Sequence, residues 1–397
     1  MFGKRIRLFT LFGFTVSIDV TWFLLFALVA WSLGAGLFPA WYGELSGTTH
    51  AVMGLAGALG LFVSVVWHEL CHSLVARRFG MPMEGITLFL FGGVAEMHDE
   101  PPSPTAEFLM AVAGPISSVV LGAIAFGASH GAGLLGASSA VTGVLVWLAI
   151  INLVLAVFNL APGFPLDGGR ALRAALWSYK GDLRWATRIA SNIGGGFGLL
   201  LMVLGFVNLV GGNLLGGLWW ILIGMFVRQA SNQGYRQLVV RELLEGEPVR
   251  RFMTRDPVTM APATTLAQFV EDYLYRTHHK LYPVVDDGRA TGCIHIRDVK
   301  PYPRDDWDDH TVGEAARDLD DATTIAPDVD ATDALARMRR GETGRLIVVE
   351  DGQAVGMLTL RDLMTFLSMK MELDDGAATV PEALEPELRQ AASDASG

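Results

Sequence analysis

The sequence predicts an α-helical membrane protein with about six transmembrane helices and a small membrane-associated β-hairpin or sheet, followed by an α/β pair of repeats. Three observations lead to this fold class. Of the 397 residues, 51% are hydrophobic, and the mean hydropathy of +0.38 is too high for an ordinary soluble protein. Residues 1–231 contain 11 Lys and Arg and 10 Asp and Glu, whereas residues 232–397 contain 19 and 31. Two similar stretches recur within this acidic second part.

Charge and cysteine content limit the partners and the compartment. The net charge of −11 comes almost wholly from the second part, so we expect no nucleic-acid partner, which would need a basic surface. Cys71 and Cys293 are the only cysteines; they make no disulfide framework and suit a reducing compartment. No small-residue cleavage pattern follows the first apolar run, so we expect a retained span rather than a signal peptide.

Six apolar runs are long enough to cross about 30 Å of hydrocarbon. They occupy residues 20–38, 52–79, 108–128, 141–160, 193–210 and 214–230. The stretches 39–50, 129–140 and 211–213 contain no Lys or Arg, whereas the N-terminus and the stretches after the second, fourth and sixth runs are basic. Because positive residues stay on the cytoplasmic side, we expect a multi-pass protein of the cell membrane whose N-terminus and acidic second part are cytoplasmic.

The second run contains the pattern His-Glu-x-x-His, formed by His68, Glu69 and His72. Histidines four residues apart leave one face of a helix about 6 Å apart and can share a metal ion. Glu69 then stands beside the metal, where its carboxylate can take a proton from the attacking water. So short a pattern can arise by chance or for structural reasons. Within a membrane, however, these residues are costly to bury and indicate a functional site.

The stretch 83–97, between the second and third runs, reads as short strands around a Gly-Gly turn. Strands near a membrane must satisfy their backbone groups within protein or at a wet cavity. Phe91, Gly92 and Gly93 could therefore offer an edge on which an extended substrate pairs. The alternative is a plain surface hairpin.

A third metal ligand is available after the fourth run. Prolines and glycines interrupt the helix there, and Asp167 follows where a helical pattern resumes. Alone, Asp167 is most simply a helix N-cap. Beside an incomplete two-histidine site it is a candidate third ligand, because three protein ligands and one open position make the usual catalytic zinc site. Asn159 could stabilise a developing oxyanion through its amide, or could simply end the helix.

Together, His68-Glu69-x-x-His72 in one run and Asn159 and Asp167 after a later one resemble the two signatures of the site-2 protease family of intramembrane zinc metalloproteases. The resemblance covers most of residues 1–231. It implies that the two histidines and Asp167 bind Zn²⁺, that Glu69 is the general base and that Asn159 contacts the substrate or an oxyanion.

This family cuts membrane-spanning helices within or next to the bilayer and often releases a transcription factor or its regulator. One departure from its pattern is Ser118, where many relatives have an asparagine. No loop is long enough for the extracytoplasmic PDZ domain of some relatives. The chain therefore resembles the compact branch that carries regulatory domains on a cytoplasmic tail.

The acidic part contains an internal repeat. Residues 282–299 align without gaps on residues 346–363, at an offset of 64, with eight of eighteen residues identical. Each copy has a Val-Val strand, an Asp-Gly turn, a second strand and an Arg-Asp pair that opens a helix. This resembles a tandem pair of cystathionine-β-synthase (CBS) domains. We expect a protease domain at 1–231, a linker at 232–251, CBS domains at 252–300 and 311–369, and a disordered acidic tail at 370–397.

The resemblance to CBS pairs implies an adenine nucleotide such as ATP in the cleft between the repeats. Thr359 and Asp362 fit the pattern of hydroxyl and carboxylate that binds it. In the first copy His295 replaces the hydroxyl while Asp298 is retained, so at most one well-formed site is expected. The alternative is that the pair only mediates homodimerisation or substrate docking.

These features predict a zinc-dependent endopeptidase that cleaves a membrane protein in regulated intramembrane proteolysis, with activity modulated through the CBS pair. The alternative is a CBS-regulated metal transporter, because transporters also place histidines and carboxylates at mid-membrane. A transport path uses ligands in relays on several helices, whereas here the ligand set is closed and Glu69 is left over as a base. Changing Glu69 to Gln separates the two hypotheses.

Overall fold

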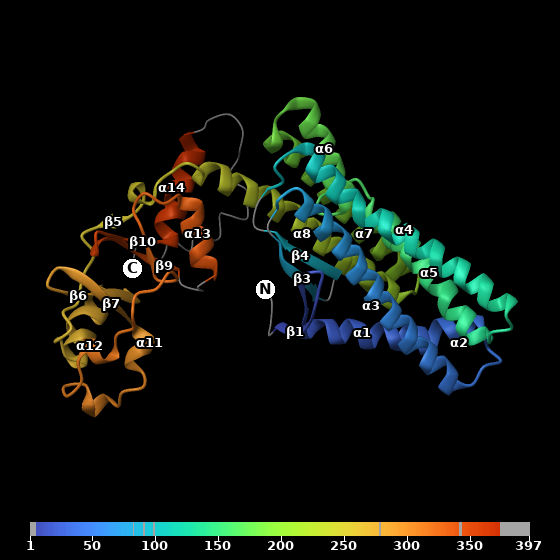
Figure 1. Cartoon of the computed structure of the whole chain (residues 1–397), viewed down its shortest axis with the longest axis horizontal. Coiled ribbons are helices and arrows are strands. Elements are labelled where there is room, and N and C mark those ends of the chain that lie inside the picture. The colour runs from blue at the N-terminus through green and yellow to red at the C-terminus, as the bar shows by residue number, and fades with distance from the viewer. Residues whose placement is uncertain are drawn as a thin grey trace. The chain divides into compact units, whose positions relative to one another are not determined.

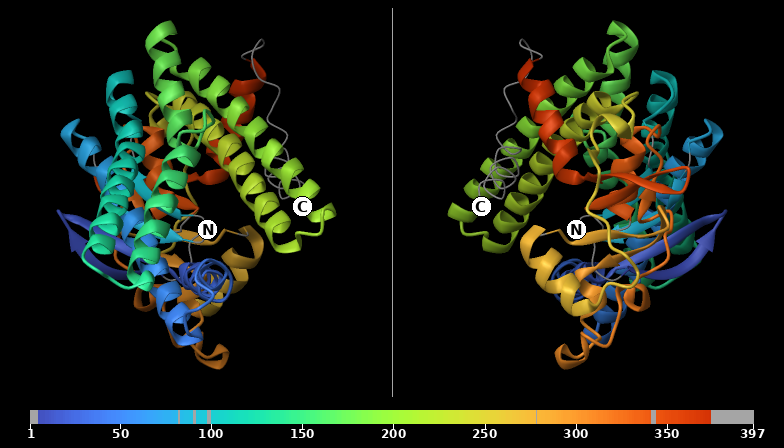
Figure 2. Two further views of the ribbon diagram at one scale, coloured as in Figure 1. Left: turned by 90° about the vertical axis from the view of Figure 1, so that its right-hand side faces the viewer. Right: turned by 90° about the vertical axis from the view of Figure 1, so that its left-hand side faces the viewer.

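The computed structural model describes residues 5–81, 83–89, 92–97, 100–277, 279–340 and 344–373. The chain forms two compact units, Met1–Gln237 and Leu238–Gly397. Figures 1 and 2 show the long helices of the first unit in blue to yellow-green, and the small sheets and short helices of the second in yellow to red. The disordered tail was expected from residue 370, but residues 370–373 still belong to a helix that ends at Leu373. From residue 374 onward the expected tail lies outside the described residues.

Long helices build the first unit. Two of them begin at serines that satisfy the free N–H groups of the first turn: Ser46 accepts a hydrogen bond from Thr49 and Ser103 accepts one from Ala106. α6 ends at Gly181, whose φ of 73° lies in the left-handed region that closes many helices. In chain order the helices are α1 (Val20–Ser32), η1 (Leu33–Leu37), α2 (Phe38–Trp41), α3 (Gly47–Arg78), α4 (Pro104–Leu134), α5 (Ser139–Asn159), α6 (Asp167–Lys180), α7 (Leu183–Val210) and α8 (Leu214–Leu244).

Five helical segments among the described residues are long and apolar enough to cross a membrane. They are Val20–Trp41, Gly47–Arg78, Pro104–Leu134, Ser139–Asn159 and Leu183–Val210. Each overlaps one of the first five predicted runs. The sixth run, 214–230, forms the first part of α8, which is not among these five segments. α8 is longer than the predicted run, and its added residues form a polar segment that ends at Leu244.

A four-stranded sheet lies beside α3. It contains β1 (Arg5–Leu11), β2 (Phe14–Asp19), β3 (Met83–Phe89) and β4 (Gly92–Met97) in that order. β1 and β2 are antiparallel, β2 and β3 parallel, and β3 and β4 antiparallel. β3 and β4 form the predicted hairpin at 83–97, whereas the N-terminal hairpin β1–β2 is an addition that the sequence analysis missed.

The buried face of this sheet packs against α3. Val16, Ile18, Ile86 and Leu88 from the strands cluster with Leu70 of the helix, and all five are at most 2% exposed. Alternate residues of a strand face the same side of a sheet. The buried residues of each strand are therefore two apart, Val16 and Ile18 in β2 and Ile86 and Leu88 in β3. The packing holds the sheet to the helix that carries His68 and His72.

The second unit contains the two repeats. β6 (Leu281–Asp286) and β7 (Arg289–His295) of the first repeat correspond to β9 (Arg345–Glu350) and β10 (Gln353–Thr359) of the second at the predicted offset of 64. A helix follows each hairpin, α11 (Ile296–Val299) and α14 (Leu360–Leu373). The other elements are η2 (Val249–Arg251), β5 (Thr254–Arg255), α9 (Leu266–Gln268), η3 (Phe269–Leu274), α10 (Tyr275–Thr277), η4 (Arg304–Asp306), α12 (Val312–Ala315), β8 (Thr324–Ile325) and α13 (Ala331–Arg340).

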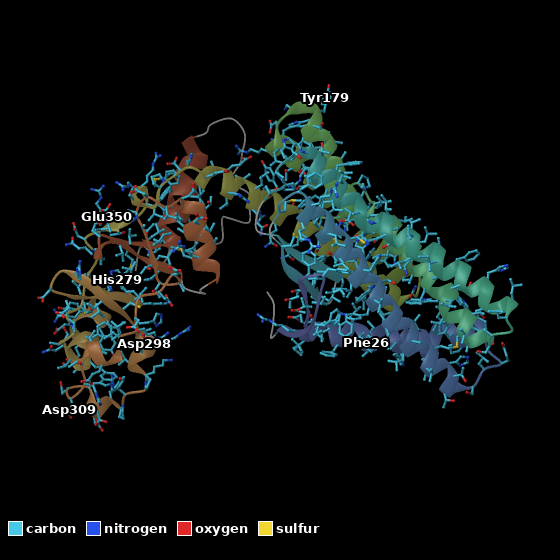
Figure 3. All side chains as sticks on the ribbon, in the orientation of Figure 1. Phe26, Tyr179, His279, Asp298, Asp309 and Glu350 are labelled. Atoms are coloured by element: carbon cyan, nitrogen blue, oxygen red, sulfur yellow. The ribbon has the colours of Figure 1, made fainter. Side chains whose placement is uncertain are left out.

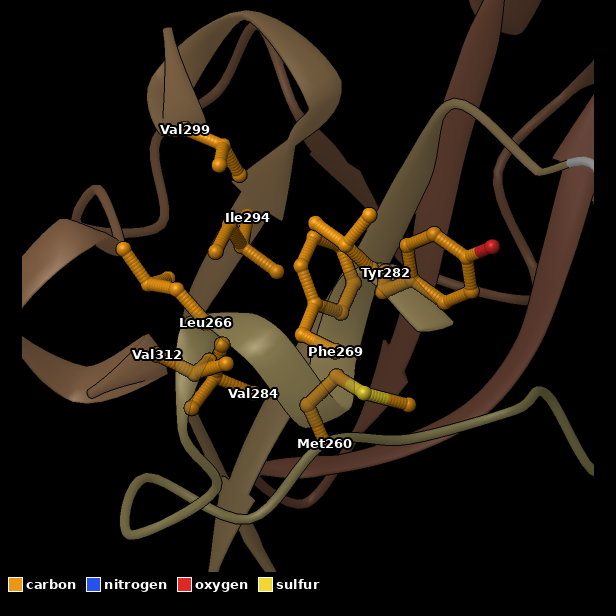
Figure 4. Packing of buried hydrophobic residues seen from close by; sticks show 9 residues of the cluster. Met260, Leu266, Phe269, Tyr282, Val284, Ile294, Val299 and Val312 are labelled. Carbon is orange, nitrogen blue, oxygen red and sulfur yellow. The ribbon is translucent and has the colours of Figure 1, made fainter. Parts of the chain in front are cut away.

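Each repeat has an apolar interior, and a further cluster joins the two. Figure 4 shows Phe269 and Tyr282 at the centre of the first repeat, with ring centroids 5.2 Å apart. Cys293 packs with Ile347 and Met357 of the other repeat. Burial raises the pKa of the Cys293 thiol, so this cysteine is a packing residue rather than a reactive one.

Candidate metal centre

Three side chains from two separate helices converge in the first unit. Nε2 of His68 lies 3.1 Å from Nε2 of His72, and the two nitrogens lie 3.1 and 3.3 Å from Oδ2 of Asp167. The three residues are 3%, 5% and 9% exposed. They are the one group of potential metal ligands of this kind found among the described residues. The structure therefore brings together the ligand set expected from the sequence.

The separations fit a zinc ion. In a tetrahedral site with Zn–N and Zn–O bonds of about 2.0–2.2 Å, neighbouring ligand atoms lie about 3.3 Å apart. The three observed separations, 3.1, 3.1 and 3.3 Å, are close to that value. Two imidazoles and one carboxylate are also a ligand set that zinc accepts, with a fourth position left open.

Both histidines present Nε2 to this point because Nδ1 is engaged elsewhere. Nδ1 of His72 donates to the carbonyl oxygen of Met110 at 2.6 Å, and Nδ1 of His68 lies 2.9 Å from Oγ of Ser118. A carbonyl only accepts, so Nδ1 of His72 carries the hydrogen and the lone pair on Nε2 faces the centre. Such contacts fix the tautomer and ring orientation of metal-binding histidines.

Gly114 of α4 keeps the centre open. A Cβ at this position would lie 2.2 Å from Nε2 of His72 and 2.5 Å from Nε2 of His68. Real side chains do not approach so closely, so only a glycine allows α4 to pass here. A metal ion between the two nitrogens would use the same space.

Asp167 reaches the centre as the first residue of α6 and not as its N-cap. Leu166 occupies the N-cap position and makes no side-chain hydrogen bond there. The preceding loop is anchored by Phe164, whose N–H donates to the carbonyl of Ala190 at 3.1 Å and whose carbonyl accepts from Ser231. The Asp167 carboxylate is thus directed at the histidines by a loop held on α7 and α8.

Glu69 lies next to the terminal strand of the sheet. A Cβ on Gly93 of β4 would lie 2.5 Å from Cγ and 3.0 Å from Oε1 of Glu69, so the strand backbone packs directly against this carboxylate. Gly92 pairs with Phe89 of β3, and β4 is the last strand of the sheet among the described residues. Phe91 lies outside the described residues.

Asn159 is not joined to the centre in the described part of the chain. It is the last residue of α5, and its side-chain amide donates to the carbonyl of Leu155 at 3.0 Å. This contact matches the alternative interpretation, in which Asn159 ends the helix. An oxyanion contact would require the amide to leave that carbonyl.

The residues expected at a nucleotide site cap the helices that follow the two hairpins. In the second repeat, the N–H and Oγ1 of Thr359 donate to Oδ2 of Asp362 at 2.8 and 2.7 Å. In the first, the N–H of His295 donates to Oδ2 of Asp298 at 2.8 Å, and Nδ1 of His295 accepts from the N–H of Arg297 at 3.0 Å. Asp298, labelled in Figure 3, is also paired with Arg317 and is 8% exposed.

Sequence reasoning missed several residues around the centre. Met110 contributes through its carbonyl, which leaves no signal in the side-chain pattern. Ser118 was noted only as a departure from a family pattern. Glu107, fully buried, pairs with Arg173 of α6 at 2.5 Å; the available signal was an acid at the edge of an apolar run, since such residues rarely lie at membrane depth without a role.

Comparison with known proteins gives matches along both units of the chain. The sequence profile "Peptidase family M50" matches residues 56–136 and 135–204, and the profile "CBS domain" matches 249–304 and 312–369. Zinc metalloprotease MJ0392 of Methanocaldococcus jannaschii is 31% identical over 376 residues, which cover 93% of this chain and 99% of that protein. Rip3 of Mycobacterium tuberculosis, also named as a zinc metalloprotease, is 35% identical over 362 residues, covering 90% and 91%.

Among solved structures, the site-2 protease from Methanocaldococcus jannaschii is 31% identical and covers 58% of this chain and 94% of its own, with a TM-score of 0.42. The full-length sequence relatives and the M50 match establish the family. The chain therefore belongs to peptidase family M50, the site-2 protease family, as a multi-pass membrane metalloprotease with a tandem pair of CBS domains.

Proposed function

We propose that this protein is a zinc-dependent endopeptidase that cleaves a membrane protein within or next to the bilayer. The observation that carries the proposal is the three-atom ligand group of His68, His72 and Asp167, with Glu69 following His68 on the same helix outside that ligand group. The two histidines and Glu69 lie on α3, which is long and apolar enough to cross a membrane. A substrate would therefore meet the centre at membrane depth.

His68, His72 and Asp167 would hold the metal in this proposal. Bound Zn²⁺ would polarise the scissile carbonyl and lower the pKa of water toward neutrality. Glu69 would take the proton from the attacking water and return it to the leaving amine. The close packing of Gly93 limits how far the Glu69 carboxylate can swing away from its neighbours.

The substrate would bind as an extended strand along β4. A helical peptide bond is shielded and its carbonyl already bonded, so the substrate helix must unwind first. Added strands bind through main-chain hydrogen bonds, and β4, the last strand of this sheet in the described part of the chain, would offer its backbone edge beside Glu69. Gly92 and Gly93 carry no side chains that would obstruct such pairing.

Glu69→Gln tests the reaction. Wild-type chain and variant are coexpressed with candidate single-span membrane proteins tagged at both ends, and the fragments are detected by immunoblot. The variant should keep its zinc and lose cleavage by at least about 10²-fold, the usual contribution of a general base. Glu44→Gln, an exposed acid outside the site, serves as control. Undiminished cleavage by Glu69→Gln would reject the mechanism, and altered metal flux without any proteolysis would favour a transporter.

Gly93→Ala tests the packing of the strand against the base. The added methyl group would collide with Glu69 and displace either the carboxylate or β4. Zinc content should remain at the wild-type level while cleavage falls. Wild-type cleavage by this variant would show that β4 has no fixed place beside Glu69 during catalysis.

We further propose that an adenine nucleotide bound by the CBS pair modulates cleavage, and that the second repeat provides the site. Thr359 supplies a hydroxyl there, whereas the first repeat has His295, and Asp298 is already paired with Arg317. ATP binding measured by calorimetry should be lost in Asp362→Ala and retained in Asp298→Ala. Homodimerisation through the CBS pair is a further part of this proposal. So is a cytoplasmic location of the N-terminus and the CBS domains, which the distribution of basic residues supports.

Regulated release of a transcription-factor precursor or its regulator is the physiological role that this arrangement suits. A protease whose cytoplasmic repeats sense a nucleotide would link cleavage to the energy state of the cell. Cleavage of a coexpressed substrate with and without ATP in isolated membranes tests this role, and equal rates would argue against it.

A further inference from the structure

A buried ion pair joins α6 to α4 near the metal centre. Nε and Nη2 of Arg173 lie 2.6 and 2.5 Å from Oε1 of Glu107, and Nη2 lies 3.2 Å from Oε2 of Glu100. The Arg173 and Glu107 side chains are 4% and 0% exposed. Burying such charges is costly, and an apolar pair of similar volume is often at least as stable. Stability alone therefore does not account for the pair.

Arg173 also contacts the loop that carries Asp167. Its guanidinium carbon lies 5.3 Å from the ring centroid of Phe164, three residues before Asp167. The backbone of Phe164 is held at the same time by the carbonyl of Ala190 and the hydroxyl of Ser231. A shift of Arg173 would therefore disturb the packing of the loop that positions the Asp167 carboxylate.

α4 serves both halves of the centre along one stripe. Glu107, Met110, Gly114 and Ser118 are spaced by three or four residues, which places them on one face of the helix. The first of them binds α6, and the other three surround the two histidines of α3. The histidines are held by α4 independently of α6, so sliding α6 along α4 would move Asp167 and leave the histidines in place.

We propose that Arg173 and Glu107 are positioning residues: their buried ion pair sets the register of α6 on α4 that holds Asp167 within ligand distance of His68 and His72. This inference rests on the proposed metal centre. An ion pair with defined hydrogen bonds fixes one register, whereas an apolar contact tolerates sliding; specifying register is the best-attested use of buried polar groups.

The test measures metal binding by the full chain purified in detergent. Zinc affinity is obtained by chelator competition, thermal stability by the melting temperature, and the ligand set by the visible absorption of the Co²⁺-substituted protein. Arg173→Met should lower zinc affinity about 10–100-fold, as loss of an outer-shell partner does, and shift the Co²⁺ spectrum toward that of Asp167→Asn. Arg188→Met, an exposed arginine on α7, should match the wild type.

The double variant Glu107→Leu/Arg173→Met separates positioning from packing. It removes both buried charges and leaves only Glu100, whose side chain is 33% exposed and can be solvated. Its melting temperature should therefore recover toward the wild-type value, while zinc affinity and the Co²⁺ spectrum stay those of Arg173→Met. Recovery of zinc affinity together with the melting temperature would overturn the inference and make the pair purely structural.

Arg173→Lys keeps the charge and most of the volume, so it provides a conservative comparison if the other variants fail to fold. It should bind zinc with an affinity between those of wild type and Arg173→Met. Wild-type affinity in both single variants would also overturn the inference. A wild-type chain that binds no zinc would instead overturn the proposed metal centre, so the two failures are distinguishable.

Discussion

Gly114 shows how little freedom the metal centre leaves to a single residue. Because a Cβ there would meet both Nε2 atoms within 2.5 Å, we expect Gly114→Ala to lose its bound zinc and its cleavage activity. Gly127 lies on the same helix, and a Cβ there would meet nothing within 4 Å, so Gly127→Ala should retain zinc. Elemental analysis of the purified variants measures this, and a full zinc complement in Gly114→Ala would contradict the proposed site.

Ser118 gives His68 a polar partner on the side away from the ligand group. Its Oγ lies 2.9 Å from Nδ1 of His68, so Ser118→Ala should free the imidazole to rotate and lower zinc affinity about 10–100-fold. Ser129→Ala is the matched control, because the Ser129 hydroxyl bonds the Phe126 carbonyl of the same helix at 2.8 Å. Chelator competition on both variants gives the comparison. Equal affinities would mean that His68 is oriented without Ser118.

The same residues mark what sequence can and cannot predict about the site. The spacing of His68 and His72 predicted a shared metal site, because helical periodicity is a local property. The broken helix made Asp167 a candidate third ligand, and the resemblance to the protease family implied that role. The partners of the Nδ1 atoms were not predictable, since they depend on how α4 crosses α3. Asn159 has a chemically suitable side chain, but its amide bonds its own helix, and no sequence pattern distinguishes these two uses.

At the scale of elements, apolarity and turn chemistry predicted most of the fold. Five predicted runs match five candidate spans, and the strands of the two repeats are related by the offset of 64 that the sequence shows. The hairpin β1–β2 was missed because it precedes the first span, in a stretch assessed only for a targeting signal. The polar end of α8 was missed because the span was predicted from apolar residues alone, and the helix continues past the last of them.

Asp330 offers a test at the scale of one element, the start of α13. Its carboxylate accepts hydrogen bonds from the N–H and hydroxyl of Thr332 at 2.8 and 2.6 Å and from the N–H of Gly246 at 2.6 Å. Burial alone would raise its pKa, but these bonds and the nearby Arg241 outweigh burial and lower the pKa below the usual 3.8. Asp330→Ala should therefore destabilise the second unit by about 1 kcal/mol, as loss of a helix cap does.

The sign of the pH dependence follows from the lowered pKa. The carboxylate stabilises the folded unit fully above about pH 4 and loses its effect as pH falls through its folded pKa. Hydrogen exchange of α13 peptides in the full chain, corrected for intrinsic rates, should show faster exchange in Asp330→Ala at pH 7 and a shrinking difference below pH 4. A difference that grows in acid would contradict this assignment.

At the scale of the whole molecule, α8 is the one described helix that begins in the first unit and ends in the second. In the first unit, Ser231 of α8 donates to the carbonyl of Phe164, in the loop before Asp167. In the second, Lys370 of α14 donates to the carbonyl of Leu243 at 3.0 Å and pairs with Glu247 at 3.3 Å. α14 is the helix that Thr359 and Asp362 cap. The helix that follows Thr359 and the loop that precedes Asp167 are therefore both hydrogen-bonded to α8.

A continuous helix can carry a shift from one end to the other only while its hydrogen-bond ladder is intact. Replacing residues 235–237 by three glycines should interrupt it, since each glycine costs about 1 kcal/mol of helix stability relative to alanine. We expect this variant to keep its zinc and basal cleavage but to lose the effect of ATP on the cleavage rate, measured in isolated membranes with a coexpressed substrate. Three alanines at the same positions preserve the helix and should preserve the ATP effect. An ATP response that survives the glycines would mean that the repeats act on the metal centre by a route other than α8.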